Sequence, residues 1–215
     1  ATVGVAFSMG LPSEFAGASK VTVKGLPAGL KYNASTHVIE GIPTKVGTQN
    51  VEISATGVSL HTVSITVSML SAWAQGTFNG YVAGGGLASM SVSSAGKITG
   101  KLSFAGTNYT FSATSYAAEG NPTNGFSFIT VAKAGKTVLP LTLLVTSAGF
   151  PATLGIASGA IGVSSPVLLY RDVWKTEAAA LTPYVGYYTA ALPGNAEYGS
   201  GYLMLTVDDS GKVKV

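Results

Sequence analysis

Apolar and polar residues alternate with a period of two along most of the chain. The alternation is clear at residues 20–24, 51–56 and 61–69, where valine, isoleucine and threonine recur. Successive side chains of a strand point to opposite faces of a sheet, and β-branched residues suit a pleated, half-buried surface. Glycine and asparagine interrupt these runs at the spacing of turns. The pattern predicts an all-β chain.

Helical periodicity is almost absent, and residues 176–181 are the only local candidate, about one turn long. Residues 137–170 contain no charged side chain, but Pro140, Pro151, Pro166 and four glycines interrupt them. A transmembrane helix needs about 20 consecutive, mostly apolar residues. This stretch therefore predicts several short buried strands, and the chain is expected to have no membrane-spanning segment.

The second part of the chain contains an internal repeat. Residues 76–83 align with 186–193, and residues 89–98 align with 204–213 after a longer turn. Each copy reads as a strand, a loop, a strand and a polar hairpin tip ending in Gly-Lys, whose glycine suits a left-handed position. About eight strands precede the second copy. They predict an antiparallel meander that curls into a β-barrel, which removes exposed sheet edges.

The second copy has no sequel comparable to residues 101–116 of the first. Two interpretations follow. The last strands close the barrel against the first ones, or the chain is a truncated piece of a longer modular surface protein. We favour the second interpretation, and the two are compatible.

The first part of the chain carries a distinct motif. Residues 25–30 read GLPAGL, residues 39–43 read IEGIP, and a strand over residues 51–56 follows. Ile39, Val46, Val51 and Ile53 are predicted to fill the space between two sheets. Over residues 2–69 the order resembles the immunoglobulin-like repeat of bacterial surface proteins, a relative of cadherin-like domains. His37 stands where that family commonly has a turn glycine.

The resemblance implies a β-sandwich that serves as a spacer or adhesion module. We therefore expect an immunoglobulin-like sandwich at residues 1–70, a linker at 71–75 and an antiparallel barrel-like domain at 76–215. The implied setting is extracellular or at the bacterial cell surface.

Composition narrows the chemistry available to the chain. Only 10% of the residues are charged and 47% are hydrophobic, which excludes a disordered chain. The absence of cysteine excludes a disulfide scaffold, a thiol nucleophile and a zinc–thiolate site. The net charge is +3, with lysines scattered along the sequence. Nucleic-acid binding normally requires clustered cations, so no nucleic-acid partner is expected.

No catalytic, cofactor-binding or metal-binding constellation is evident. The two histidines, His37 and His61, have neither a Gly-x-Ser-x-Gly elbow nor metal-ligand spacing beside them. The nine acids are dispersed, and the Asp208-Asp209-Ser210-Gly211 run lacks the remaining ligands of a calcium loop. The chain is expected not to be an enzyme.

Aromatic residues give the one indication of binding. Tyr170, Trp174, Tyr187 and Tyr188 are close in sequence, and exposed aromatic faces bind sugars and proteins. Two hypotheses remain. The first is a non-enzymatic adhesion or spacer module, and the second is a barrel that binds a glycan or small apolar molecule, as an accessory module of a larger enzyme or by itself. The expected partner is a surface glycan or another protein. A barrel interior filled by large side chains would count against the second hypothesis.

Overall fold

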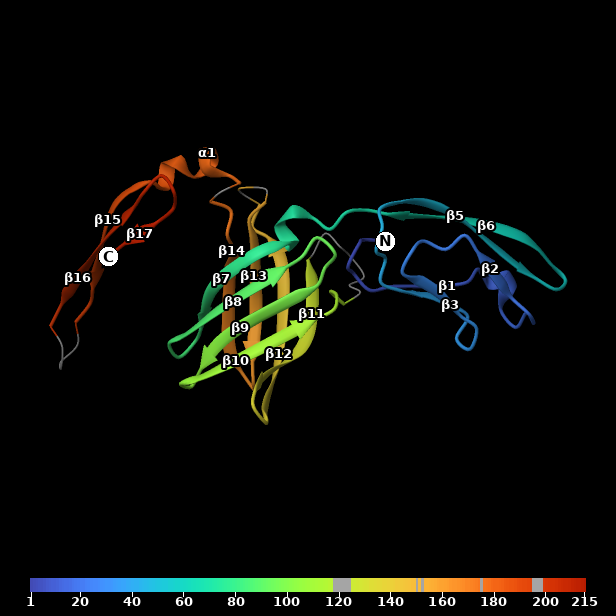
Figure 1. Ribbon diagram of the computed structural model, residues 1–215, viewed down its shortest axis with the longest axis horizontal. Coiled ribbons are helices and arrows are strands. Elements are labelled where there is room, and N and C mark those ends of the chain that lie inside the picture. Colours follow the sequence, from blue (N-terminus) through green and yellow to red (C-terminus); the bar gives the residue numbers. More distant parts are fainter. Residues whose placement is uncertain (118–124, 150, 152, 175, 195–198) are drawn as a thin grey trace.

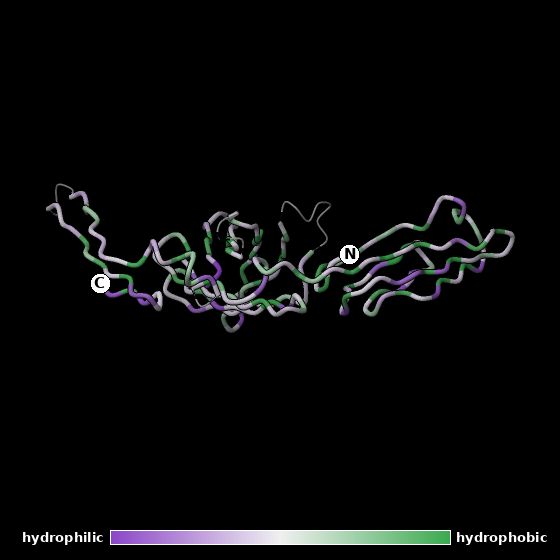
Figure 2. The backbone as a smooth tube through the Cα atoms, turned by 90° about the horizontal axis from the view of Figure 1, so that it is seen from above, coloured by the Kyte–Doolittle hydropathy of each residue, from purple (hydrophilic) through white to green (hydrophobic). Residues whose placement is uncertain are grey.

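A computed structural model places three β-structures in a row along the longest axis of the molecule (Figure 1). It describes all residues except 118–124, 150, 152, 175 and 195–198. A pair of small sheets lies at one end, a closed barrel lies in the middle, and a third small sheet lies at the other end. Figure 2 shows the same order from above. The chain is therefore almost wholly β, as the alternation predicted.

The N-terminal part packs two three-stranded sheets face to face. One sheet has the order β1-β4-β3 and the other β2-β5-β6. The strands are β1 (Phe7–Gly10), β2 (Thr22–Lys24), β3 (Leu30–Asn33), β4 (Val38–Gly41), β5 (Gly47–Ala55) and β6 (Val58–Val67). The buried side chains between the sheets come from both of them, with Leu30 and Ile39 on one side and Val51, Ile53 and Ile65 on the other. This shared core confirms the predicted β-sandwich.

The prediction for Val46 was wrong. Ile39, Val51 and Ile53 are fully buried, whereas Val46 is 51% exposed. It lies in the connection before β5, where the two-residue period of a strand does not direct its side chain. His37 adopts φ +53°, a conformation that glycine enters without steric cost. That geometry gives a physical reason for a turn glycine at this position.

The middle part is an eight-stranded antiparallel barrel. Its strands follow the chain in order, and the sheet closes where β14 pairs with β7. The strands are β7 (Gly76–Val82), β8 (Gly86–Val92), β9 (Ile98–Phe104), β10 (Thr107–Ala113), β11 (Phe126–Ala134), β12 (Thr137–Ser147), β13 (Gly155–Ile161) and β14 (Ser165–Arg171). The uncharged stretch forms β12, β13 and most of β14, as predicted. No helix among the described residues is long and apolar enough to cross a membrane.

One end of the barrel is closed by the segment that enters it. A short 3-10 helix, Ala72–Ala74, places Trp73 in a stack with Phe126 at 5.3 Å between ring centroids. The hydroxyl of the fully buried Tyr116 donates a 2.6 Å hydrogen bond to the carbonyl of Ala74. Burial raises the pKa of the Tyr116 phenol well above its usual value. The phenol therefore stays protonated and holds this helix on the barrel.

Arg171 fastens the same end of the barrel. Its Nε donates to the carbonyl of Gln75, and its Nη1 donates to the carbonyl of Thr153 at 3.2 Å. The guanidinium thus joins the linker before β7 to the connection before β13, which are far apart in sequence. The single arginine of the chain has a structural role here.

The N-terminal segment, residues 2–6, runs between the sandwich and the barrel. Thr2 pairs with Ser68 and Val5 pairs with Tyr116, both in parallel orientation. The amide of Tyr116 donates to the carbonyl of Gly4 at 3.0 Å. Gly4 also lies against the β8–β9 hairpin tip, where a Cβ atom added to Gly96 would be 2.6 Å from the Gly4 Cα. We call these contacts the joint.

The last three strands form a separate sheet. They are β15 (Gly186–Leu192), β16 (Gly201–Val207) and β17 (Val213–Lys214), preceded by the short helix α1 (Ala178–Leu181). The interpretation in which the last strands close the barrel was wrong, because β14 and β7 already pair with each other. The eight barrel strands, β7 to β14, pair with one another at both edges, so no barrel edge remains for β15.

Candidate binding surface

The barrel interior is filled by large side chains. Phe78, Phe128, Leu141, Leu143 and Leu169 are each no more than 1% exposed and belong to one continuous core. Further large residues belong to the same core: Met90, Ile98, Phe111, Tyr116, Phe126 and Ile161. Such packing leaves the described interior without room for a small-molecule ligand. The hypothesis of a ligand inside the barrel therefore has no support.

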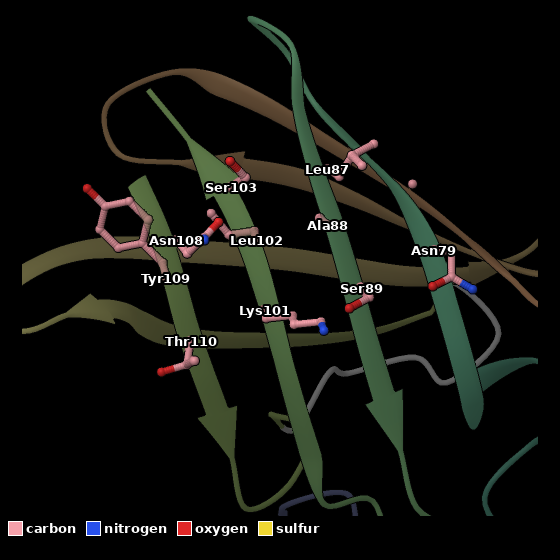
Figure 3. Close-up of a pocket in the computed structure, with 11 residues that line it drawn as sticks. Asn79, Leu87, Ala88, Ser89, Lys101, Leu102, Ser103, Asn108, Tyr109 and Thr110 are labelled. Atoms are coloured by element: carbon pink, nitrogen blue, oxygen red, sulfur yellow. The ribbon is translucent and has the colours of Figure 1, made fainter. Parts of the chain in front are cut away.

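The outer face of the barrel carries a hollow of about 650 Å³ instead. Figure 3 shows its lining on four neighbouring strands, with Asn79 on β7, Ser89 on β8, Lys101 on β9 and Thr110 on β10. The register pairs these four residues in a continuous row, Asn79 with Ser89, Ser89 with Lys101, and Lys101 with Thr110. Residues that pair across an antiparallel sheet share one face and lie about 5 Å apart.

The row continues at both ends. Tyr170 of β14 pairs with Asn79, and Lys133 of β11 pairs with Thr110. We call the six residues Tyr170, Asn79, Ser89, Lys101, Thr110 and Lys133 the polar row. It begins with an aromatic ring and carries two ammonium groups, so it offers a stacking surface and hydrogen-bond donors on one face.

Charge on the barrel is one-sided. Residues 76–171 contain five cations, Lys97, Lys101, Lys133, Lys136 and Arg171, against one acid, Glu119, which lies outside the described residues. The rest of the chain supplies the other eight acids. An anionic ligand would therefore meet a favourable potential on the barrel.

A parallel row of less polar residues lies beside the polar row. Tyr81 pairs with Leu168 on one side and with Leu87 on the other. Tyr81 and Leu87 are exposed, and Leu87 lines the hollow. Sequence reasoning missed Tyr81, Asn79 and Lys101 because they are dispersed along the chain and only the strand register brings them together. Tyr81 occupies an outward-facing position in the alternating sequence of β7, and this exposed tyrosine could have indicated a binding surface.

The four aromatic residues proposed from the sequence do not form one surface. Tyr170 is 46% exposed and lies in the polar row. Tyr187 and Tyr188 are successive residues of β15, so their side chains point to opposite faces of the C-terminal sheet. The Tyr187 hydroxyl contacts the sulfur of Met204, and the Tyr188 hydroxyl donates to the carbonyl of Tyr184 at 2.6 Å. Their role in binding stays a prediction.

Trp174 serves as a support for the C-terminal sheet. Its indole Nε1 donates to the carbonyl of Asp209 at 2.9 Å. Its ring lies directly on Gly211, where an added Cβ atom would be 2.3 Å from the indole Cγ. The ring therefore packs against the β16–β17 hairpin tip, and part of its face is not available to a ligand.

The described residues show structural uses for both histidines. Nδ1 of His61 lies 2.9 Å from a carboxylate oxygen of Glu14, and Nδ1 of His37 lies 3.1 Å from the hydroxyl of Tyr32. No group of three or more His, Asp or Glu side chains in the described part of the chain could hold a metal ion. The carboxylate of Asp208 accepts hydrogen bonds at a hairpin tip. The hydrogen bond from the Ser210 hydroxyl is the largest cause of the lowered pKa of Asp208.

Comparison with known proteins finds a family match in the N-terminal part. Residues 1–72 match the family described as "Putative Ig domain", in agreement with the resemblance noted in residues 2–69. This match covers the sandwich and ends at the linker before the barrel. No curated protein matches the chain.

Proposed function

We propose that this chain is a non-enzymatic module of a secreted or cell-surface bacterial protein, which acts as a structural spacer or in adhesion. The observation that carries the proposal is the joint, because it fixes the sandwich to the barrel through backbone contacts rather than through a single flexible linker. The immunoglobulin-like family assignment of residues 1–72 is consistent with a module at the cell surface. We also propose a domain boundary between residues 70 and 76.

The contacts of the joint are suited to holding a fixed angle. Two chain segments cross between the modules, namely residues 2–6 and the linker that precedes β7. Val5 is 8% exposed and belongs to the barrel core although it precedes the first strand of the sandwich. The two glycines, Gly4 and Gly96, let the backbones meet without intervening side chains. A spacer needs such a connection, because a flexible linker would not keep a set distance between its ends.

Single-molecule energy transfer would test the rigid joint. The chain has no cysteine, so Ser35→Cys and Ser164→Cys would place one dye on the sandwich and one on the barrel. We expect one narrow distance distribution. Gly96→Ala should broaden it, because its methyl group would overlap the Gly4 backbone.

Gly106→Ala is the matched control for that substitution. Gly106 has φ +74°, nearly the same as Gly96, but nothing lies within 4 Å of its added Cβ. Both variants carry the same backbone strain, of roughly 1–2 kcal/mol, and only one disturbs the joint. A broad distribution in the unaltered chain, or equal behaviour of the two variants, would contradict the proposal.

The polar row supports a second candidate function, the binding of an anionic glycan on the outer face of the barrel. Tyr170 can stack on a sugar ring, and Lys101 and Lys133 can pair with its acidic groups. A glycan array with acidic and neutral members would test this function. Tyr170→Ala and Lys101→Ala should each abolish the signal, and Lys136→Ala, in the turn after β11, should leave it unchanged. Silence of the unaltered chain across the array would exclude this candidate.

A further inference from the structure

The C-terminal sheet repeats the beginning of the barrel in its hydrogen-bond register. In the barrel, Gly76 pairs with Val92, and Val92 pairs with Ile98. In the C-terminal sheet, Gly186 pairs with Val207, and Val207 pairs with Val213. These are the residues that the sequence repeat aligns. β15, β16 and β17 are therefore the structural counterparts of β7, β8 and β9.

The hairpin tips of the two copies also agree. The Gly96 amide donates to the carbonyl of Ser93 at 2.9 Å with φ +75°, and the Gly211 amide donates to the carbonyl of Asp208 at 3.0 Å with φ +78°. Each tip glycine is covered by a residue that comes before its own copy. Gly4 covers Gly96, and Trp174 covers Gly211. In each copy, therefore, a preceding segment of the chain packs against the hairpin tip: residue Gly4 does so in the barrel and Trp174 in the C-terminal sheet.

The two copies differ in what covers their inner faces. Phe78, Met90 and Ile98 are at most 1% exposed, because the remaining strands of the barrel enclose them. Their counterparts by register are Tyr188, Leu205 and Val213. Tyr188 is 40% exposed and Val213 is 53% exposed. Figure 2 shows apolar stretches along this sheet, which stands away from the barrel.

Both edges of the C-terminal sheet are also open. In the barrel, the outer edge of β9 pairs with β10 and the outer edge of β7 pairs with β14. Among the described strands, nothing pairs with the corresponding edges of β17 and β15. Folded proteins usually cover an apolar sheet face and pair or protect open strand edges, and within the described structure this sheet has neither form of protection. Five further strands would cover its face and satisfy its two edges together.

We propose that β15, β16 and β17 are the first three strands of a second eight-stranded barrel, which five strands of the same polypeptide following Val215 complete. The same polypeptide is the occupant that the topology favours, because β9 and β10 are joined by a tight turn between Phe104 and Thr107. A second copy could not supply counterparts of β10 to β14, since its own barrel uses them. The missing strands need about 70 residues, the length from Lys101 to Arg171.

This proposal does not depend on the spacer or glycan function, and the natural gene tests it. The chain would be expressed as residues 1–215 and again with the next 70 or so codons of its own reading frame, and backbone amide exchange over residues 186–214 would be compared. We expect fast exchange in the shorter chain and exchange at least about tenfold slower in the longer one, because an enclosed sheet opens rarely. A reading frame that ends at Val215 would overturn the proposal.

Two substitutions in the longer chain separate the inner face from the outer one. Leu205→Lys places a charge on the face that corresponds to Met90, whereas Met204→Lys places it on the opposite face. The first should restore fast exchange over residues 186–214 and leave residues 76–171 protected, and the second should change neither. Equal effects would overturn the proposal. So would a dimer of the shorter chain in which residues 186–214 are already protected, because a second copy would then be the occupant.

Discussion

Removal of the Tyr116 hydroxyl tests how the barrel holds its entering segment. Tyr116→Phe keeps the ring contacts with Phe126 and Phe128, at 5.4 and 6.2 Å between centroids, and removes only the hydrogen bond to Ala74. Ala74 is fully buried, so its carbonyl would lose that partner where water does not enter. An unsatisfied buried acceptor costs about 1–3 kcal/mol. For a domain of this size a loss of about 2 kcal/mol lowers Tm by roughly 8–16 °C.

Thermal and urea unfolding followed by circular dichroism would measure this loss. Tyr109→Phe is the matched control, because Tyr109 is also buried and makes no hydrogen bond within the described part of the chain. It should change the free energy of unfolding by less than about 0.5 kcal/mol. Equal stability of the Tyr116→Phe variant and the unaltered chain would refute the role given to this hydroxyl.

The same substitution has a pH signature. Burial raises the folded-state pKa of Tyr116 above that of the unfolded chain, about 10. The stabilisation is therefore complete below pH 10 and is lost as the pH rises further, because the unfolded chain then releases a proton that the folded chain retains. The difference in unfolding free energy between the unaltered chain and the Tyr116→Phe variant should be constant from pH 6 to 9 and shrink toward pH 11. A difference that does not change with pH would contradict this assignment.

Three further substitutions have outcomes that the structure specifies. Phe128→Ala should lower the free energy of unfolding by about 3–5 kcal/mol in urea titrations, and Ile129→Ala, next to it on the exposed outer face, by less than about 1 kcal/mol. Arg171→Lys should lower it by about 1–3 kcal/mol, because one ammonium group cannot reach both carbonyls that the guanidinium joins; an unchanged Tm would exclude that role. Hydrogen bonds to the Asp208 carboxylate, of which the one from the Ser210 hydroxyl is the strongest cause, lower the Asp208 pKa. The ionised carboxylate therefore stabilises the β16–β17 tip above pH 4, and this stabilisation is lost as the pH falls further. Asp208→Ser should abolish the resulting change of the tip at low pH. Amide chemical shifts measured between pH 2 and 6 would report it, and identical profiles for both chains would contradict it.

Local pattern was sufficient for most of the fold. The alternation of apolar and polar residues predicted strands such as β5 and β6, and the repeat predicted two hairpin tips whose glycines have positive φ. Val46 escaped the rule because it lies outside a strand. Barrel closure between β14 and β7 joins residues about 90 positions apart, and local patterns carry no information about such contacts.

Sequence proximity was a poor guide to the candidate site. Tyr187 and Tyr188 are neighbours in the chain, and the pleat of β15 separates them onto opposite faces. The polar row has the reverse property, because its six members come from six strands and meet only through register. Prediction of the polar row from sequence would have required the register of β14 with β7 and of each strand from β7 to β10 with the next one.

The parallel pairing of Thr2 with Ser68 determines how the chain would bear tension. The polypeptide enters the sandwich and leaves it side by side and in the same direction. A pull on the two flanking segments would draw these neighbours past each other along the strand axis, so their contacts would be loaded in shear and together. While the contacts last, the force passes directly from Thr2 to Ser68 and on to the barrel. The rest of the sandwich then lies outside the path of the force and remains folded, because the load does not act on its strands.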